Sequence, residues 1–114
     1  VAKKFGVKVL ELGRNYGPAA ARNEGAAAAT APIVLFIDAD VLVRGDTLTR
    51  VLDTFSKDPE LAAVFGSYDT EPSAPDFLSQ YRNLLHHYVH QKSRSDASTF
   101  WSGCGAIKKD LFLE

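Results

Sequence analysis

Several residue types and patterns are absent or scarce in this sequence, and each absence excludes a class of protein. The 114 residues include a single cysteine, Cys104. One cysteine excludes an internal disulfide framework and a zinc site built from several cysteines, and it fits a reducing compartment. No apolar run approaches the roughly 18 residues of a membrane span. We therefore expect a cytoplasmic chain that forms one globular domain over residues 1–114.

The sequence also has no excess of positive or negative charge. Thirteen Lys and Arg residues stand against 14 Asp and Glu residues, which gives a formal net charge of -1. A protein that binds nucleic acid non-specifically needs a basic surface to displace counterions, so we expect no nucleic-acid partner. The hydrophobic fraction of 46% is ordinary for a globular protein and argues against disorder.

Methionine does not occur at all, and the chain opens on Val1-Ala2-Lys3-Lys4. A natural chain normally starts with Met. We therefore expect this sequence to be an excerpt of a longer protein.

The order of predicted elements indicates the fold class. Apolar and polar residues alternate over 7–12, whereas 33–37 is a continuous apolar run, as in a strand that is buried on both faces. Helical patterns follow these strands, so we predict an α/β domain with a mainly parallel sheet. The expected strands cover residues 7–12, 33–37 and 61–65, and the expected helices cover 18–30, 46–56, 75–91 and a short segment that begins near the end of the chain.

The sharpest chemical feature is Asp38-Ala39-Asp40, directly after the buried strand. Side chains alternate along a strand, so both carboxylates can point the same way, at the strand end where open α/β sheets bind ligands. Two close carboxylates repel each other unless a cation lies between them, and Mg²⁺ or Mn²⁺ could also hold a diphosphate. Alternatively, Asp38 caps a turn and Asp40 is solvated. The buried strand before the triplet favours a site.

A second feature is the loop that leads into the predicted helix at Pro18. The N-terminus of a helix offers backbone N–H groups to an anion. Arg22, in the first turns of that helix, could reach a phosphate or neutralise one of the aspartates. A structural ion pair is an equally good interpretation of Arg22.

Three segments together resemble the family 2 glycosyltransferases of the GT-A fold: N-Y-G-P-A-A-A-R-N-E-G-A, V-L-F-I-D-A-D and F-W-S-G-C-G-A-I-K-K-D-L-F. The resemblance covers nearly the whole chain. It implies the central part of a catalytic domain with a Rossmann-like, three-layer α/β fold. It also implies a nucleotide-sugar site at Gly17, Arg22, Asn23, Asp38 and Asp40, with Asp38 and Asp40 on the metal, and a sugar and acceptor pocket at Trp101, Ser102 and Gly103.

The implied reaction is metal-dependent transfer of a sugar, with inversion, from a nucleotide-diphosphate donor to a hydroxyl of a carbohydrate or lipid-linked acceptor. Members of the family usually begin with a strand, a helix and a second strand, and none of these precedes Val1. Their general base is expected beyond Glu114, so we assign no catalytic residue in this chain.

Two other functions stay open. The chain could be a non-catalytic or degenerate domain that binds nucleotide-sugar, or, less favoured, an α/β interaction domain. A receiver-like interaction domain needs a lysine and a hydroxyl at neighbouring strand ends, and no convincing pair is present.

The remaining features concern the long helix and the sheet edges. His86 and His90 share a helix face at a spacing that can bind zinc, but no third ligand is evident and a solvated role is favoured. The same helix could touch a lipid-linked acceptor or the inner face of a membrane, although ordinary packing is favoured because its polar face is not markedly basic. Uncovered sheet edges lead us to expect a homodimer.

Overall fold

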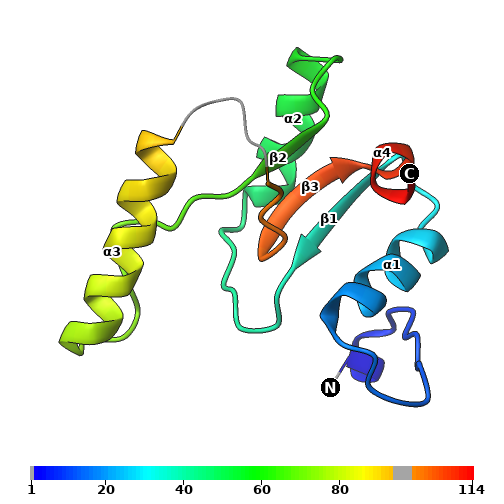
Figure 1. The fold of residues 1–114 in the computed structure, drawn as a ribbon, viewed down its shortest axis with the longest axis horizontal. Coiled ribbons are helices and arrows are strands. Elements are labelled where there is room, and N and C mark those ends of the chain that lie inside the picture. The colour runs from blue at the N-terminus through cyan, green and yellow to red at the C-terminus, as the bar shows by residue number, and fades with distance from the viewer. Residues whose placement is uncertain (1, 94–98) are drawn as a thin grey trace.

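The computed structural model describes residues 2–93 and 99–114 (Figure 1). Helix α1 begins at Pro18, where the fixed φ of proline suits the first helical position. Most predicted elements are confirmed within about two residues, as expected where local patterns are strong. The elements are η1 (Ala2–Phe5), α1 (Pro18–Ala28), β1 (Ile33–Ile37), α2 (Thr47–Lys57), β2 (Ala63–Phe65), α3 (Phe77–Lys92), β3 (Cys104–Lys108) and α4 (Lys109–Leu113).

The sheet differs from the predicted one. Its strand order is β1-β3-β2, and β3 is antiparallel to both neighbours. Ala106 lies at the centre, opposite Leu35 of β1 and Val64 of β2. The prediction of a mainly parallel sheet is therefore wrong for the described residues. The strand–helix–strand order suggested that β1 and β2 would pair, but the chain leaves a gap between them that β3 later fills in the opposite direction.

The predicted strand over residues 7–12 is also wrong. This segment has no regular secondary structure, and most of its residues are exposed. An alternating pattern forms a strand only where a neighbouring strand accepts its hydrogen bonds. Among residues 2–93 and 99–114, the sheet provides no partner for this segment. An ion pair joins Glu11 of this segment to Lys3 of η1.

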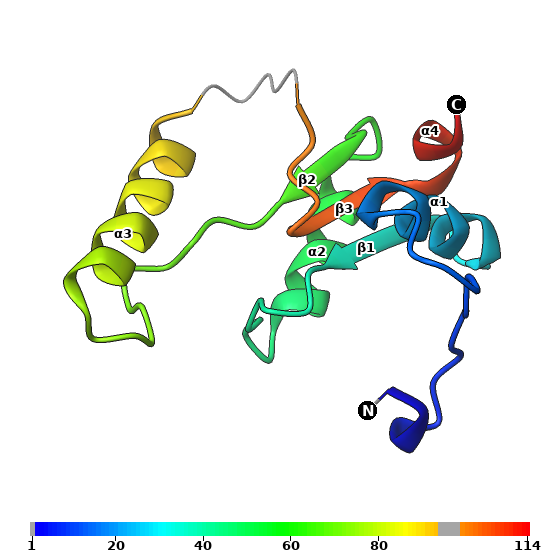
Figure 2. The same ribbon diagram turned by 60° about the horizontal axis from the view of Figure 1, so that its bottom comes forward.

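Helices lie on both faces of the sheet. Consecutive residues of a strand point to opposite faces, so Leu35 and Phe36 of β1 mark the two sides. Leu35 borders a hollow together with Val51 of α2. The Phe36 ring contacts the Phe112 ring of α4, with centroids 4.8 Å apart. Figure 2 shows α2 and α4 on different sides of the sheet, so the chain combines a small sheet with helices, as expected of an α/β domain.

Helix α1 packs beside α4. Ala26 is 0% exposed, and small alanine side chains allow this close approach. The Lys109 side chain crosses to the end of α1, where its Nζ donates to the Ala29 carbonyl over 2.6 Å. These contacts fix the direction in which α1 presents its polar side chains.

Helix α3 stands apart from the sheet in both ribbon views (Figures 1 and 2). It begins at Asp76, whose carboxylate accepts a hydrogen bond from the Ser79 backbone N–H at 3.0 Å. This bond to Ser79 holds the pKa of Asp76 below its usual value. Several large apolar side chains of α3 are exposed, among them Phe77 at 82%. No helix of the described part is long and apolar enough to cross a membrane.

The hydrophobic core is small. Within the described ranges, the buried apolar residues are Ala26, Phe55 and Ala106. Much apolar surface is consequently open to solvent, which is the kind of surface that drives association. The expected homodimer stays a prediction.

A substitution at Gly105 tests the packing of β3, the central strand. A Cβ at this position would lie 2.7 Å from Phe100 Cζ, so we expect Gly105→Ala to destabilise the fold by about 1–3 kcal/mol through overpacking. Gly25 in α1 is the matched control, because a Cβ there meets nothing within 4 Å. Gly25→Ala should stabilise by about 0.5–1 kcal/mol. Urea unfolding measures both effects, and equal effects of the two substitutions would contradict the packing of β3.

Candidate functional site

The candidate site forms where the carboxyl end of β1 meets the segment that leads into β3. The Asp38 backbone N–H donates to the Gly103 carbonyl at 2.9 Å. The Asp38 carbonyl then accepts from the Val41 N–H at 3.0 Å, which turns the chain directly after the strand. Antiparallel pairing of β1 with β3 requires this meeting, because Ile37 lies opposite Cys104. Two segments that are distant in sequence thus share one sheet edge.

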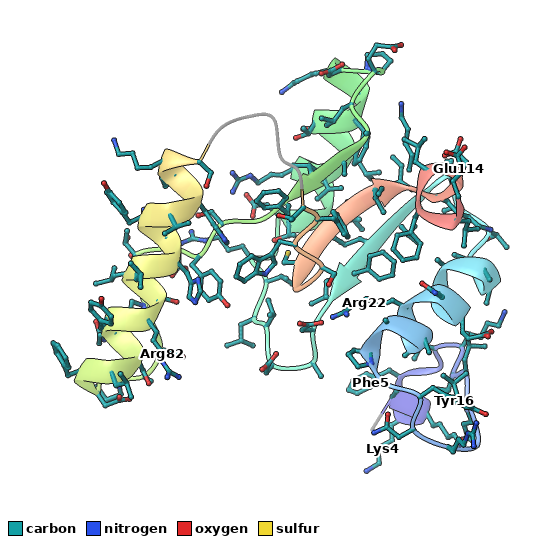
Figure 3. The ribbon with its side chains drawn as sticks, viewed as in Figure 1. Lys4, Phe5, Tyr16, Arg22, Arg82 and Glu114 are labelled. Atoms are coloured by element: carbon teal, nitrogen blue, oxygen red, sulfur yellow. The ribbon has the colours of Figure 1, made fainter. Side chains whose placement is uncertain are left out.

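Arg22 reaches this edge from α1, as Figure 3 shows. Its Nη2 lies 2.6 Å from Asp38 Oδ1, in an ion pair whose Arg22 and Asp38 side chains are 25% and 43% exposed. The ion pair identifies which aspartate Arg22 neutralises, a point that the sequence left open. Asn23, its neighbour, is exposed.

The N-terminus of α1 has less capacity for an anion than expected. Pro18 has no N–H, and the Gly17 N–H donates to the Asn15 side chain at 2.8 Å. The Ala21 N–H bonds to the Gly17 carbonyl, which leaves the amides of Ala19 and Ala20 in the first turn. Gly17 has φ 86°, a left-handed conformation that glycine adopts without strain. Its clearest role is therefore to turn the chain into α1.

A first hollow of about 420 Å³ opens beside Asp38. The structure brings Asp38 together with all three residues predicted for the sugar and acceptor pocket, Trp101, Ser102 and Gly103. Gly103 allows the close approach, because a Cβ there would lie 2.8 Å from Trp101 Nε1 and 3.5 Å from Asp38 Oδ2. Thr99 and Phe100 complete the wall.

Asp40 borders a second, larger hollow of about 750 Å³, between the sheet and α2. Trp101 and Gly103 border both hollows, so they form the boundary between them. Asp40 is exposed, whereas Asp38 is half-buried. The two carboxylates thus lie at one strand end but line different hollows.

Sequence reasoning missed the residues that border the second hollow from the end of β2. Tyr68 and Asp69 follow this strand, and Asp69 Oδ2 pairs with Arg44 Nη2 at 3.3 Å. The rule that ligand sites gather at the carboxyl ends of strands could have found them, since β2 runs parallel to β1.

The histidines of α3 lie against aromatic rings. His86 and His90 pack against Trp101, with ring centroids 5.5 and 4.7 Å away. Burial lowers the pKa of His90, and the nearby His86 and His87 lower it further. Within residues 2–93 and 99–114, no group of three or more His, Cys, Asp or Glu side chains is arranged to hold a metal ion.

The fold and the site together define an α/β domain in which the acidic end of β1 lies next to the glycine-containing segment before β3. The family model described as Glycosyl transferase family 2 matches residues 1–114. The chain belongs to this family.

Two curated relatives are similar over part of the chain. Both are described as pre-mycofactocin glycosyltransferase, from Mycobacterium tuberculosis strains CDC 1551 / Oshkosh and ATCC 25618 / H37Rv. Each is 45% identical over 58 residues, which is 51% of this chain and 12% of the relative. The match thus spans about an eighth of the relatives' length. No solved structure matches the chain.

The ion pair between Arg22 and Asp38 should contribute modestly to stability. Pairs with this exposure typically contribute about 0.2–1 kcal/mol, because water screens them. We expect coupling in that range from a double-mutant cycle of Arg22→Gln and Asp38→Asn, measured by urea unfolding. The more exposed pair Arg44–Asp69 is the control and should show weaker coupling. Stronger coupling in the control pair would contradict the arrangement of the site.

Proposed function

We propose that this domain transfers a sugar from a nucleotide-diphosphate donor to an acceptor hydroxyl. Membership of glycosyltransferase family 2 supports sugar transfer in general. The observation that carries the finer proposal is the meeting of Asp38 with the loop that contains Trp101, Ser102 and Gly103. An anchored carboxylate beside an aromatic ring suits a sugar, since hydroxyl groups donate to carboxylates and ring C–H groups pack on an indole face.

Asp38 is suited to orient the donor. Arg22 holds its Oδ1, and its backbone is bonded to Gly103, so the carboxylate has little freedom to rotate. Oδ2 faces the Gly103 side of the first hollow, where a ligand could use it as an acceptor. In this proposal Asp38 accepts a hydrogen bond from the ribose or lies beside the diphosphate. Gly17, directly before α1, and Arg22 and Asn23 of α1 complete the proposed donor side.

In this proposal a divalent cation, Mg²⁺ or Mn²⁺, lies at the strand end, where the protein would supply two carboxylates and the diphosphate the further oxygen ligands. Asp38 and Asp40 carry two negative charges, and Arg22 compensates only the first of them through its ion pair. Asp40 is exposed at the second hollow, and among residues 2–93 and 99–114 its carboxylate is not engaged in an ion pair, so it is accessible to a cation. Hard cations prefer such carboxylate oxygens. When bound, the cation would stabilise the negative charge of the leaving diphosphate.

The acceptor side is proposed at Trp101, Ser102 and Gly103. The boundary position of Trp101 between the two hollows would let one ring contact the transferred sugar and the incoming acceptor. We propose a carbohydrate or lipid-linked hydroxyl as the acceptor, and inversion at the anomeric carbon. Deprotonation of that hydroxyl is not assigned to a residue of this chain.

A second candidate function is binding of nucleotide-sugar without transfer. Among the described residues that line the first hollow, Asp38 is the only acid, and Arg22 already engages it. Because Arg22 Nη2 holds Asp38 Oδ1 at 2.6 Å, only Oδ2 is left to approach an acceptor hydroxyl. This observation favours binding over catalysis for the chain by itself.

Calorimetric titration of UDP tests the proposed donor site. We expect UDP to bind in the presence of MnCl₂ and to bind much more weakly after EDTA is added. Asp40→Asn should weaken the manganese-dependent binding by roughly tenfold or more, which is about 1.4 kcal/mol. Asp53→Asn, on the exposed side of α2, is the control that removes the same charge away from the site and should bind as the wild type does. Equal binding with and without metal would contradict the proposed role of Asp40.

Release of UDP from UDP-sugars, with and without simple sugar acceptors, separates the two candidate functions. Acceptor-dependent release supports transfer, whereas metal-dependent binding without release supports the binding domain.

A further inference from the structure

Aromatic rings from α3 and from the segment after β2 cluster around Trp101. His90, His86 and Tyr68 all approach the indole nearly edge-on, at interplanar angles of 79°, 72° and 84°. The nearest is His90, with its centroid at 4.7 Å. Tyr68 also stacks on His86 at 5.2 Å. Edge-to-face and offset stacking are the favoured geometries of aromatic pairs, so the rings restrict the indole together.

Hydrogen bonds connect α3 to the segment that supplies Tyr68. His87 Nδ1 lies 2.5 Å from the Tyr68 carbonyl, and Asn83 Nδ2 donates to the Asp69 carbonyl at 2.7 Å. Gln91 Nε2 donates to Ser67 Oγ at 3.1 Å. The end of β2 is thus tied along one side of α3. This connection holds Tyr68 against the histidines although the helix stands apart from the sheet.

His90 is the member of the cluster whose charge matters most. Both of its ring nitrogens are buried from water and have no hydrogen-bond partner among the described residues. The groups around it are Phe65 from β2, Tyr68 beyond that strand, His86 on its own helix and Trp101. Among the described residues, the charged groups that act on His90 are His86 and His87, and no carboxylate is among them. Burial, and after it the charges of His86 and His87, lower the pKa of His90 and so favour its neutral form.

We propose that neutral His90, supported by His86 and Tyr68, is a positioning residue that holds the Trp101 indole at the boundary between the two hollows. Through this contact, α3 shapes the sugar and acceptor side of the site. The consequence for sugar transfer rests on the proposed function, whereas the geometry of the cluster does not. Protonation of His90 would introduce a charge that the cluster cannot solvate, and Trp101 would then move outward.

Trp101 is the single tryptophan of the chain, so tryptophan fluorescence reports on this indole alone. The test measures acrylamide quenching of Trp101 at one pH above and one pH well below 6.5, the ordinary pKa of histidine. In the wild type, quenching should rise at the lower pH, by roughly twofold if the indole goes from 39% to nearly full exposure. His90→Phe keeps an aromatic ring without a charge and should give low quenching at both pH values. His90→Ala should give high quenching at both.

His87→Gln is the matched control, because it removes a neighbouring histidine of the same helix yet keeps a donor for the Tyr68 carbonyl. This variant should show the same rise in acrylamide quenching at the lower pH as the wild type. The proposal is overturned if His90→Phe retains the pH dependence of the wild type, or if His90→Ala leaves quenching unchanged. Far-UV circular dichroism at each pH selects folded variants, and His90→Phe alone decides the outcome if His90→Ala unfolds. Because the readout needs neither UDP nor transfer, its failure is distinct from failure of the proposed function.

Discussion

The site depends on the antiparallel return of β3 between β1 and β2. Pairing of Ile37 with Cys104 brings the segment before β3 to the carboxyl end of β1, and the bond from the Asp38 N–H to the Gly103 carbonyl closes the junction at 2.9 Å. A wholly parallel sheet would send that segment to the opposite edge. The acidic strand end and the Trp101 loop would then lie apart. Strand direction thus decides whether the residues proposed to bind the donor and acceptor meet.

Charge and close packing then set the details of the site. Arg22 fixes the Asp38 carboxylate from α1, while Asp40, two residues later, stays exposed to solvent. Gly103 lets the indole lie close enough to border both hollows. This division gives the two aspartates different properties, one oriented by a guanidinium and the other accessible to a cation. The proposed roles in holding the donor and the metal follow from that difference.

Local patterns predicted the helices and two of the three strands, but not β3 or the pairing of the strands. The apolar run of β1 and Pro18 at the start of α1 specify structure within a few residues, and both were predicted. Strand order depends on contacts between residues that are distant in sequence, such as the pairing of Leu35 with Ala106, and no local pattern contains this information. The Arg22–Asp38 pair was left open for the same reason. Family resemblance supplied the pocket residues around Trp101, but packing of His90 against that ring had no counterpart in the sequence.

The most direct test of the central claim is the position of a manganese ion in crystals of the domain grown with UDP and MnCl₂. Its anomalous scattering locates the metal without reference to activity. The account predicts a peak within coordination distance of an Asp40 oxygen, roughly 2.0–2.2 Å for a small hard cation, with UDP beside Asp38. A peak only at other carboxylates, or UDP bound away from the end of β1, would contradict it.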